Sequence, residues 1–145
     1  MTDLTFVEVP RADYDVLRLA LEEAQLPIDD MAEPGRRFFR LSDNNGDIGY
    51  VDLEGEGPDR LLRSLVVLPS RRGQGHGKML VNRLEAASSE VAERLYLLTT
   101  GAGDFFRALG YADRERSAAP SVISGTAQFT SLCPASAAYL VKEIR

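Results

Sequence analysis

A buried strand that breaks into a glycine-rich turn constrains this chain more than any other sequence feature. Residues 60–68, "RLLRSLVVL", are almost continuously apolar, as in a strand that is covered on both faces. The segment 69–80, "PSRRGQGHGKML", follows and contains three glycines and three basic side chains in twelve positions. Residues 74–91 then show the apolar spacing of a helix lying on a sheet. The sequence therefore predicts a strand, a glycine turn and a helix in direct succession.

A glycine turn that opens a helix is a favourable place for a phosphate group. Backbone N–H groups converge there, and the helix dipole adds partial positive charge. Glycine lets a ligand approach the backbone closely, and Arg71, Arg72 and Lys78 add full positive charges. The alternative is a plain tight turn with solvated arginines.

The remaining pattern predicts a mixed α/β domain that spans residues 1–145. Strands are expected at 4–9, within 36–54 as a hairpin around Asn45-Gly46, at 60–68, at 94–100 and at 137–144. Helices are expected at 11–25, 74–91, 101–111 and 118–134.

Composition excludes several classes of protein. No apolar stretch approaches the ~20 residues of a membrane span, and the first residues lack the pattern of a secretion signal. The net charge of −5 argues against a nucleic-acid partner. Cys133 is the one cysteine and His76 the one histidine, so neither a disulfide framework nor a structural zinc site is expected. We expect a cytoplasmic protein with no metal.

Three phosphate-binding motifs compete for the glycine turn. A P-loop ending at Lys78 would need glycine where Arg72 stands and a hydroxyl residue where Met79 stands. A dinucleotide fingerprint starting at Gly73 would need glycine at Lys78. The third pattern, Arg-x-x-Gly-x-Gly, is matched at all three fixed positions of "RGQGHG" by Arg72, Gly75 and Gly77. It resembles the coenzyme A pyrophosphate loop of the GNAT family of N-acetyltransferases.

The surroundings of the loop resemble the same family over about residues 36–113. Leu65, Val67 and Pro69 form the family's apolar approach to the loop, and "FFRALGY" is similar to its aromatic segment after the next strand. The resemblance implies a mostly antiparallel sheet of about six to seven strands, flanked by helices and splayed at the central strands.

The resemblance also implies acetyl-CoA as cosubstrate and a set of residues that bind it. Backbone groups of the central strand would hold the pantetheine arm and the acetyl carbonyl, backbone N–H groups of the loop would hold the pyrophosphate, and an aromatic ring would pack against the cofactor. His76 would act through its backbone. These residues are Leu65, Val66, Val67, Arg72, Gly73, Gln74, Gly75, His76, Gly77, Lys78 and Phe106.

The chemistry implied by the family is direct attack of a neutral amine on the thioester. Many members have a tyrosine that protonates the leaving thiolate, but this chain has Phe106 at that position. The proton could come instead from Ser64, Thr99 or Thr100, or from water, or the thiolate could leave without a proton donor. Ser64 and Thr100 are the catalytic candidates.

Arg63 and Tyr50 are the candidates for binding the acceptor. An arginine in an apolar strand is costly to bury without an anion. Arg63 therefore either clamps a substrate carboxylate or forms an internal salt bridge to Asp52 or Glu54.

The C-terminal segment "APSVISGTAQFTSLCPASAAYL", with "LLRSLVV" and "LYLLTT", resembles the arsenic-resistance branch of the family. That resemblance implies an amino-acid-like acceptor of the arsinothricin or phosphinothricin type. Cys133 is expected to pack in the interior, since a lone cysteine is a poor arsenic(III) site. Another small amine or a peptide N-terminus as acceptor, or a non-catalytic acyl-CoA-binding module, stays open, as does the choice between monomer and homodimer.

Overall fold

The computed structural model describes residues 3–26, 28–126, 128–132 and 137–145. Its seven-stranded sheet has the order β1-β2-β3-β4-β5-β7-β6. Neighbouring strands are antiparallel except for β4 and β5, which run parallel. The predicted fold class is therefore confirmed.

The strands and helices follow the expected order closely. The strands are β1 Thr5–Glu8, β2 Arg36–Asp43, β3 Gly46–Glu54, β4 Asp59–Val67, β5 Arg94–Thr99, β6 Ala112–Asp113 and β7 Ala138–Glu143. The α-helices are α1 Tyr14–Glu23, α2 His76–Ser88, α3 Gly103–Ala108 and α4 Ser121–Ser124. Short turns are η1 Arg11–Asp13, η2 Pro69–Arg71, η3 Arg116–Ala118 and the π-helical η4 Gln128–Leu132.

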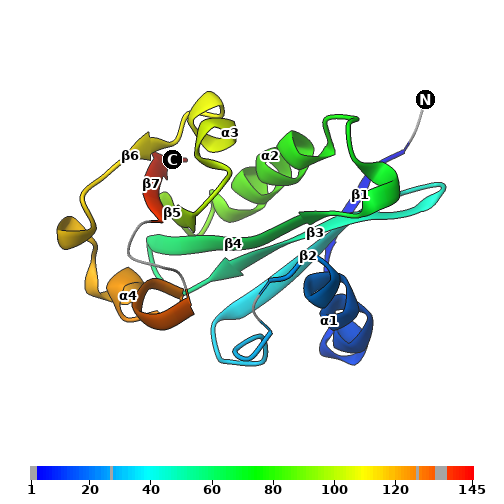
Figure 1. Cartoon of the computed structure of the whole chain (residues 1–145), viewed down its shortest axis with the longest axis horizontal. Coiled ribbons are helices and arrows are strands. Elements are labelled where there is room, and N and C mark those ends of the chain that lie inside the picture. Colours follow the sequence, from blue (N-terminus) through cyan, green and yellow to red (C-terminus); the bar gives the residue numbers. More distant parts are fainter. Residues whose placement is uncertain (1–2, 27, 127, 133–136) are drawn as a thin grey trace.

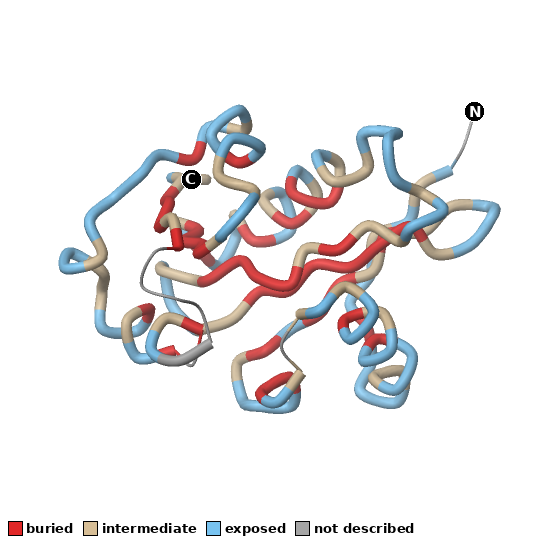
Figure 2. Tube along the Cα trace, viewed as in Figure 1, coloured by how far each residue is buried: buried red, intermediate tan, exposed pale blue. Residues whose placement is uncertain are grey.

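The sheet separates two layers of helices (Figure 1). Helices α2 and α3 cover one face, while α1 and α4 lie against the other. Strands β3 and β4 are the most continuously buried part of the trace (Figure 2), which explains the nearly unbroken apolar sequence of residues 60–68. One hydrophobic cluster fills the α2–α3 side, and two smaller clusters fill the α1 and α4 sides.

A bulge in β4 opens the sheet at its centre. Ser64 has a left-handed backbone with φ 57°, and the register of β3 against β4 shifts between Tyr50 and Asp52. Pairing of β4 with β5 is confined to Asp59, Arg60 and Leu61. From Leu62 onward, the edge of β4 that faces β5 has no strand partner among the described residues. The two central strands therefore splay apart beyond Leu61.

The other side of the bulge is packed very closely. Gly49 on β3 pairs with Val67, and a Cβ added at Gly49 would lie 2.3 Å from the carbonyl oxygen of Val66 and 2.9 Å from Leu80 Cδ1. Only glycine lets β3, β4 and α2 approach to this distance.

The predicted helix over 118–134 is wrong in its extent, because the segment is broken into α4 and η4. The hydroxyl of Thr126 donates to the carbonyl of Ile123 (2.7 Å) and accepts from the N–H of Phe129 (3.3 Å). The side chain thereby replaces backbone partners that a continuous helix would use. The β6 strand is an addition that the sequence pattern did not indicate.

No helix within the described part of the chain combines the length and the apolar character that a membrane crossing requires.

Replacing Gly49 with alanine should destabilise the fold. The added methyl group meets a backbone oxygen that cannot move without distorting β4. We expect a loss on the order of 1–3 kcal/mol, as for other overpacked positions, measured as a lowered Tm. Gly101→Ala is the control, because a Cβ there would meet nothing within 4 Å. Equal melting temperatures for the two variants would contradict the close approach of β3 and β4.

Candidate active site

A cleft occupies the opening between β4 and β5. Its volume is about 150 Å³. The lining residues come from both faces of the sheet, because they belong to hydrophobic clusters on opposite sides or to the strands between them. They are Leu26, Leu62, Arg63, Ser64, Leu65, Leu97, Leu98, Thr99, Ala102, Phe106 and Gln128.

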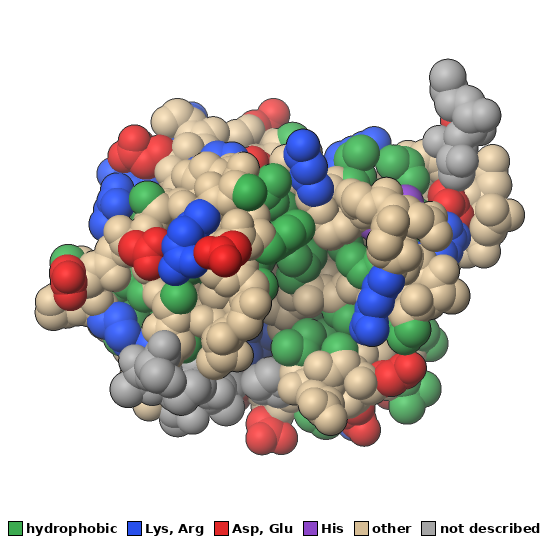
Figure 3. Space-filling model, turned by 45° about the horizontal axis from the view of Figure 1, so that its top comes forward, with side chains coloured by type: hydrophobic (Ala, Val, Ile, Leu, Met, Phe, Trp, Pro, Cys, Tyr) green, Lys and Arg blue, Asp and Glu red, His purple; other side chains and the backbone are tan. Residues whose placement is uncertain are grey.

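Lining from both faces is impossible in a continuous sheet, where alternate side chains are separated by the backbone layer. In this molecule Leu62 and Leu97 belong to the cluster on the α2–α3 side, whereas Leu26 packs in the cluster of α1. Figure 3, turned to bring the α2–α3 side forward, shows hydrophobic side chains around a hollow near the middle of the molecule. The splay therefore lets side chains from both faces of the sheet line one cleft.

The glycine loop lies beyond the C-terminal end of β4 and opens α2. Gly73 and Gly75 have φ of 78° and 79°, and a Cβ at either position would meet nothing within 4 Å. The loop surface is thus open to a ligand. The first turn of an α-helix has N–H groups without intrahelical partners, and the N–H of Met79 is bonded to Gly75 O at 3.3 Å. This geometry suits an anion.

The two arginines of the loop have different partners. Arg71 binds both carboxylate oxygens of Asp43 and the carbonyl of Gly46 at the β2–β3 turn, so it anchors the loop and is not free for a ligand. The hydrogen bond from Arg71 lowers the pKa of Asp43 to about 2. Arg72 donates through Nε to the carbonyl of Val67 at 3.0 Å. Lys78 is exposed.

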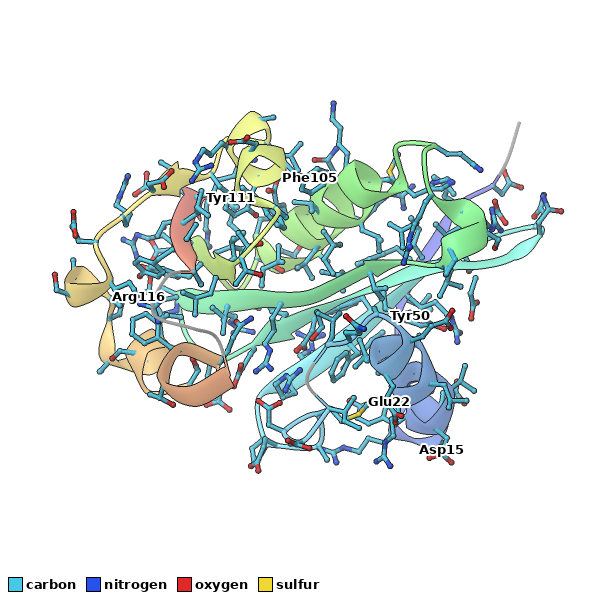
Figure 4. All side chains as sticks on the ribbon, in the orientation of Figure 1. Asp15, Glu22, Tyr50, Phe105, Tyr111 and Arg116 are labelled. Carbon is cyan, nitrogen blue, oxygen red and sulfur yellow. The ribbon has the colours of Figure 1, made fainter. Side chains whose placement is uncertain are left out.

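Aromatic rings connect the loop to the cleft. Phe105 lies where α3 approaches α2 (Figure 4), and its ring would be 3.3 Å from a Cβ at Gly77. Phe106 is buried, lines the cleft and packs edge-to-face on Phe105 and Tyr111. The hydroxyl of Tyr111 donates to Glu85 at 2.9 Å, and burial raises its pKa.

The predicted hydroxyl residues occupy different places. Ser64 lines the cleft at the bulge. Thr100 is exposed and lines a neighbouring hollow of about 250 Å³ with Asp104 and Arg107, outside the cleft. Thr99 is the hydroxyl at the end of β5 that reaches the cleft, and it accepts a hydrogen bond from the N–H of Ala102 at 3.0 Å.

Arg63 is buried in a charged cluster at the edge of the cleft. It donates to Asp30 (2.8 and 3.2 Å) and to Glu54 (2.8 Å), and its Nε lies 3.9 Å from Asp52. The internal salt bridge considered from the sequence is therefore present, and Asp30 is a further partner. Nε itself has no hydrogen-bond partner among the described residues.

The cluster continues into β2 through Arg36, which binds both Asp30 and Asp52. Burial acts to raise the pKa of Asp30, but the hydrogen bond and charge of Arg63 lower it. Burial also acts to lower the pKa of Arg63, while Asp30 and Glu54 raise it. The positive charge of Arg63 is thus held in place by carboxylates.

Two other predicted residues lie away from the cleft. Tyr50 is on the α1 side of the sheet (Figure 4) and is not among the cleft-lining residues. Its hydroxyl donates to Asp47 at 2.8 Å, and burial raises its pKa to about 12. The ring of His76 lies 3.3 Å from Gln74 Oε1, at the start of α2. Cys133 lies outside the described residues.

A larger hollow of about 310 Å³ lies elsewhere, against β5 and β7. Its walls include Tyr96, which donates to Asp59, and Arg94, which binds the same carboxylate. It is remote from the glycine loop and the bulge, so the smaller cleft is the candidate site. No group of three or more potential metal ligands gathers anywhere in the described ranges.

Sequence reasoning missed Leu26, Asp30 and Gln128. The first two lie in the irregular segment after α1, and the third lies in η4. No periodicity signals which side chains of irregular segments point inward. The desolvation cost of burying Arg63 in an apolar strand was the one available indication that an additional carboxylate was needed.

Comparison with known proteins agrees with this geometry. Residues 34–113 match the model of the acetyltransferase (GNAT) domain. A mycothiol acetyltransferase of Streptomyces coelicolor is 39% identical over 71 residues, which are 48% of this chain and 23% of the relative.

Solved structures share the fold. N-acetylglutamate synthase from Neisseria gonorrhoeae, complexed with coenzyme A and L-arginine, superposes with a TM-score of 0.77 at 15% identity, over 97% of this chain and 33% of that chain. An aminoglycoside 6'-N-acetyltransferase complexed with coenzyme A gives a TM-score of 0.67 at 19% identity, with 97% of each chain covered.

The chain thus spans less than a quarter of the mycothiol acetyltransferase and a third of the synthase chain. The family match, in contrast, covers more than half of this chain and includes the bulged strand, the glycine loop and the aromatic segment. This chain belongs to the GNAT acetyltransferase family.

Proposed function

We propose that this protein transfers the acetyl group of acetyl-CoA to the amine of a small molecule. The observation that carries the proposal is the cleft, which is lined from both faces of the sheet and lies between the β4 bulge and the end of β5. A thioester arriving from the α2–α3 side and an amine arriving from the α1–α4 side would meet there.

The coenzyme side of the site fits the shape and charge of acetyl-CoA. The pantetheine arm would run along the unpaired edge of β4 at Leu65, Val66 and Val67. There it would take the place of a strand partner and bind the backbone groups that β5 does not pair with. The carbonyl of Val67 is already bonded to Arg72. The pyrophosphate would bind backbone N–H groups between Gly73 and Lys78 at the start of α2.

The reaction joins the amine nitrogen to the thioester carbon and breaks the carbon–sulfur bond. One proton leaves the nitrogen, and one proton reaches the thiolate. Phe106 cannot supply that proton, whereas Ser64 lines the cleft and Thr99 lies on its opposite wall. These hydroxyl groups, with water, are our candidates for the proton donor; Thr100, the other predicted hydroxyl, lines the neighbouring hollow.

An amino-acid-like acceptor, of the phosphinothricin or arsinothricin type, is our more specific proposal. Arg63 supports it, because this guanidinium lines the cleft and its Nε lacks a hydrogen-bond partner among the described residues. A substrate carboxylate or oxyanion could bind there. Phe106 favours the second candidate function, a module that binds acyl-CoA without turnover.

Release of free thiol from acetyl-CoA separates the two functions. We expect thiol release that depends on an added primary amine, with phosphinothricin, glycylglycine and spermidine as the first probes. A binding module would give saturable coenzyme A binding in calorimetry and no thiol above the rate without enzyme for any amine. Acceleration by phosphinothricin alone would support the amino-acid-like class.

Replacing Gly75 with valine should abolish acetyl-CoA binding. The side chain would occupy the open loop surface, and we expect at least a tenfold loss, as for one charge-assisted hydrogen bond of ~1.5–3 kcal/mol. Gly57→Val is the matched control, because Gly57 has the same φ of 79° and the same empty surroundings in the β3–β4 turn. Calorimetry should show normal affinity for the control. Equal affinity in both variants would refute the loop assignment.

Replacing Arg63 tests the substrate clamp against a purely internal salt bridge. Arg63→Ala removes the guanidinium that binds Glu54 and leaves Arg36 as the remaining cationic partner of Asp30, so it should cost about 3–5 kcal/mol of stability. If the guanidinium also binds substrate, the KM for phosphinothricin should rise about tenfold or more in Arg63→Lys, while the KM for acetyl-CoA stays unchanged. Arg36→Lys is the control, since Arg36 belongs to the charged cluster but does not line the cleft. A lowered Tm with an unchanged acceptor KM would remove the clamp.

A further inference from the structure

Gln128 lines the cleft and carries a buried polar atom without a hydrogen-bond partner among the described residues. The residue begins η4, lines the cleft and is 8% exposed. Its Oε1 is buried and has no hydrogen-bond partner among the described residues. A buried carbonyl oxygen without a donor is rare in folded proteins, because it loses its hydrogen bonds to water without replacing them.

Neighbouring contacts hold the segment around Gln128 in place. Thr130 donates to the carbonyl of Thr126 through its backbone N–H and its hydroxyl, both at 3.0 Å. The ring of Phe129 packs edge-to-face on Tyr139 of β7 at 5.8 Å. The guanidinium of Arg116 lies 4.8 Å from the Phe129 ring and donates to its carbonyl. The segment that carries Gln128 is therefore held in place by the contacts of its neighbours.

The rest of the cleft restricts what can satisfy Oε1. Most of the lining is apolar, and the other polar members are Arg63, Ser64 and Thr99. Arg63 donates to Asp30 and Glu54, and the Thr99 hydroxyl accepts from the N–H of Ala102; neither of them nor Ser64 donates to Oε1. An incoming ligand with an N–H or O–H group is the natural donor for a carbonyl oxygen.

We propose that the side-chain carbonyl of Gln128 accepts one N–H of the acceptor amine and thereby selects primary amines; this inference rests on the proposed acetyl transfer. A neutral primary amine has two N–H groups and one lone pair. One N–H binds Oε1, the second loses its proton, and the lone pair is directed at the thioester carbon. A secondary amine has a single N–H, which cannot serve both purposes.

The test compares Gln128→Leu with the wild type in the thiol-release assay. At saturating acetyl-CoA we expect kcat/KM for the best primary amine of the panel to fall about three- to tenfold, the effect of one lost hydrogen bond. The preference of the wild type for that amine over its N-methyl analogue should shrink in the variant by a similar factor. The Kd for coenzyme A should be unchanged.

A melting experiment separates this role from a structural one. Because leucine removes an unsatisfied buried oxygen, the Tm of Gln128→Leu without ligands should be equal to or higher than that of the wild type. Thr130→Val is the control: it disturbs the same segment outside the cleft, so its Tm should fall while its amine preference stays that of the wild type.

The outcomes are distinct. Wild-type turnover with unchanged kinetics in Gln128→Leu would overturn the inference and leave acetyl transfer standing. A lowered Tm with an unchanged amine preference would show a structural role and would also overturn it. No thiol release by the wild type with any amine would refute acetyl transfer and the role of Gln128 together.

Discussion

The left-handed backbone of Ser64 is the constraint on which the rest of the site depends. It occurs in the middle of a buried strand, where a residue with a Cβ rarely adopts positive φ. The resulting bulge shifts the pairing with β3 and ends the pairing with β5 after Leu61. An ordinary β4 would keep both edges paired, and the sheet would separate its two faces completely.

The charged cluster beside the bulge holds together the elements around it. Asp30 comes from the segment after α1, Arg36 from β2, Asp52 and Glu54 from β3, and Arg63 from β4. Burying these charges costs desolvation energy, which their mutual hydrogen bonds must offset. The cluster therefore specifies where the irregular segment after α1 docks more than it adds to net stability. That segment also supplies Leu26 to the cleft.

The sequence predicted the parts of the fold that depend on local chemistry. Apolar runs located β4 and β5, Asn45-Gly46 located the β2–β3 turn, and the glycine spacing located the start of α2 within two residues. The predicted helix over 118–134 failed because the Thr126 hydroxyl competes for backbone groups. Residues of irregular segments, such as Asp30 and Gln128, escaped prediction because tertiary packing alone decides where they point. Tyr50 was expected at the substrate, but its strand position places it beneath α1.

Under the proposed acetyl transfer, a cleft lined from both faces of the sheet has a consequence for kinetic order. Its wall on one side is built by α3 and the two central strands, and on the other by the segment after α1 and by η4. Two reactants that approach from opposite faces need not pass one another, and each product can retreat along the path by which its precursor came. Sterically, neither ligand has to bind or leave first. The two walls also come from separate stretches of chain, so mutations in η4 would change one wall without disturbing the bulged strand and the glycine loop.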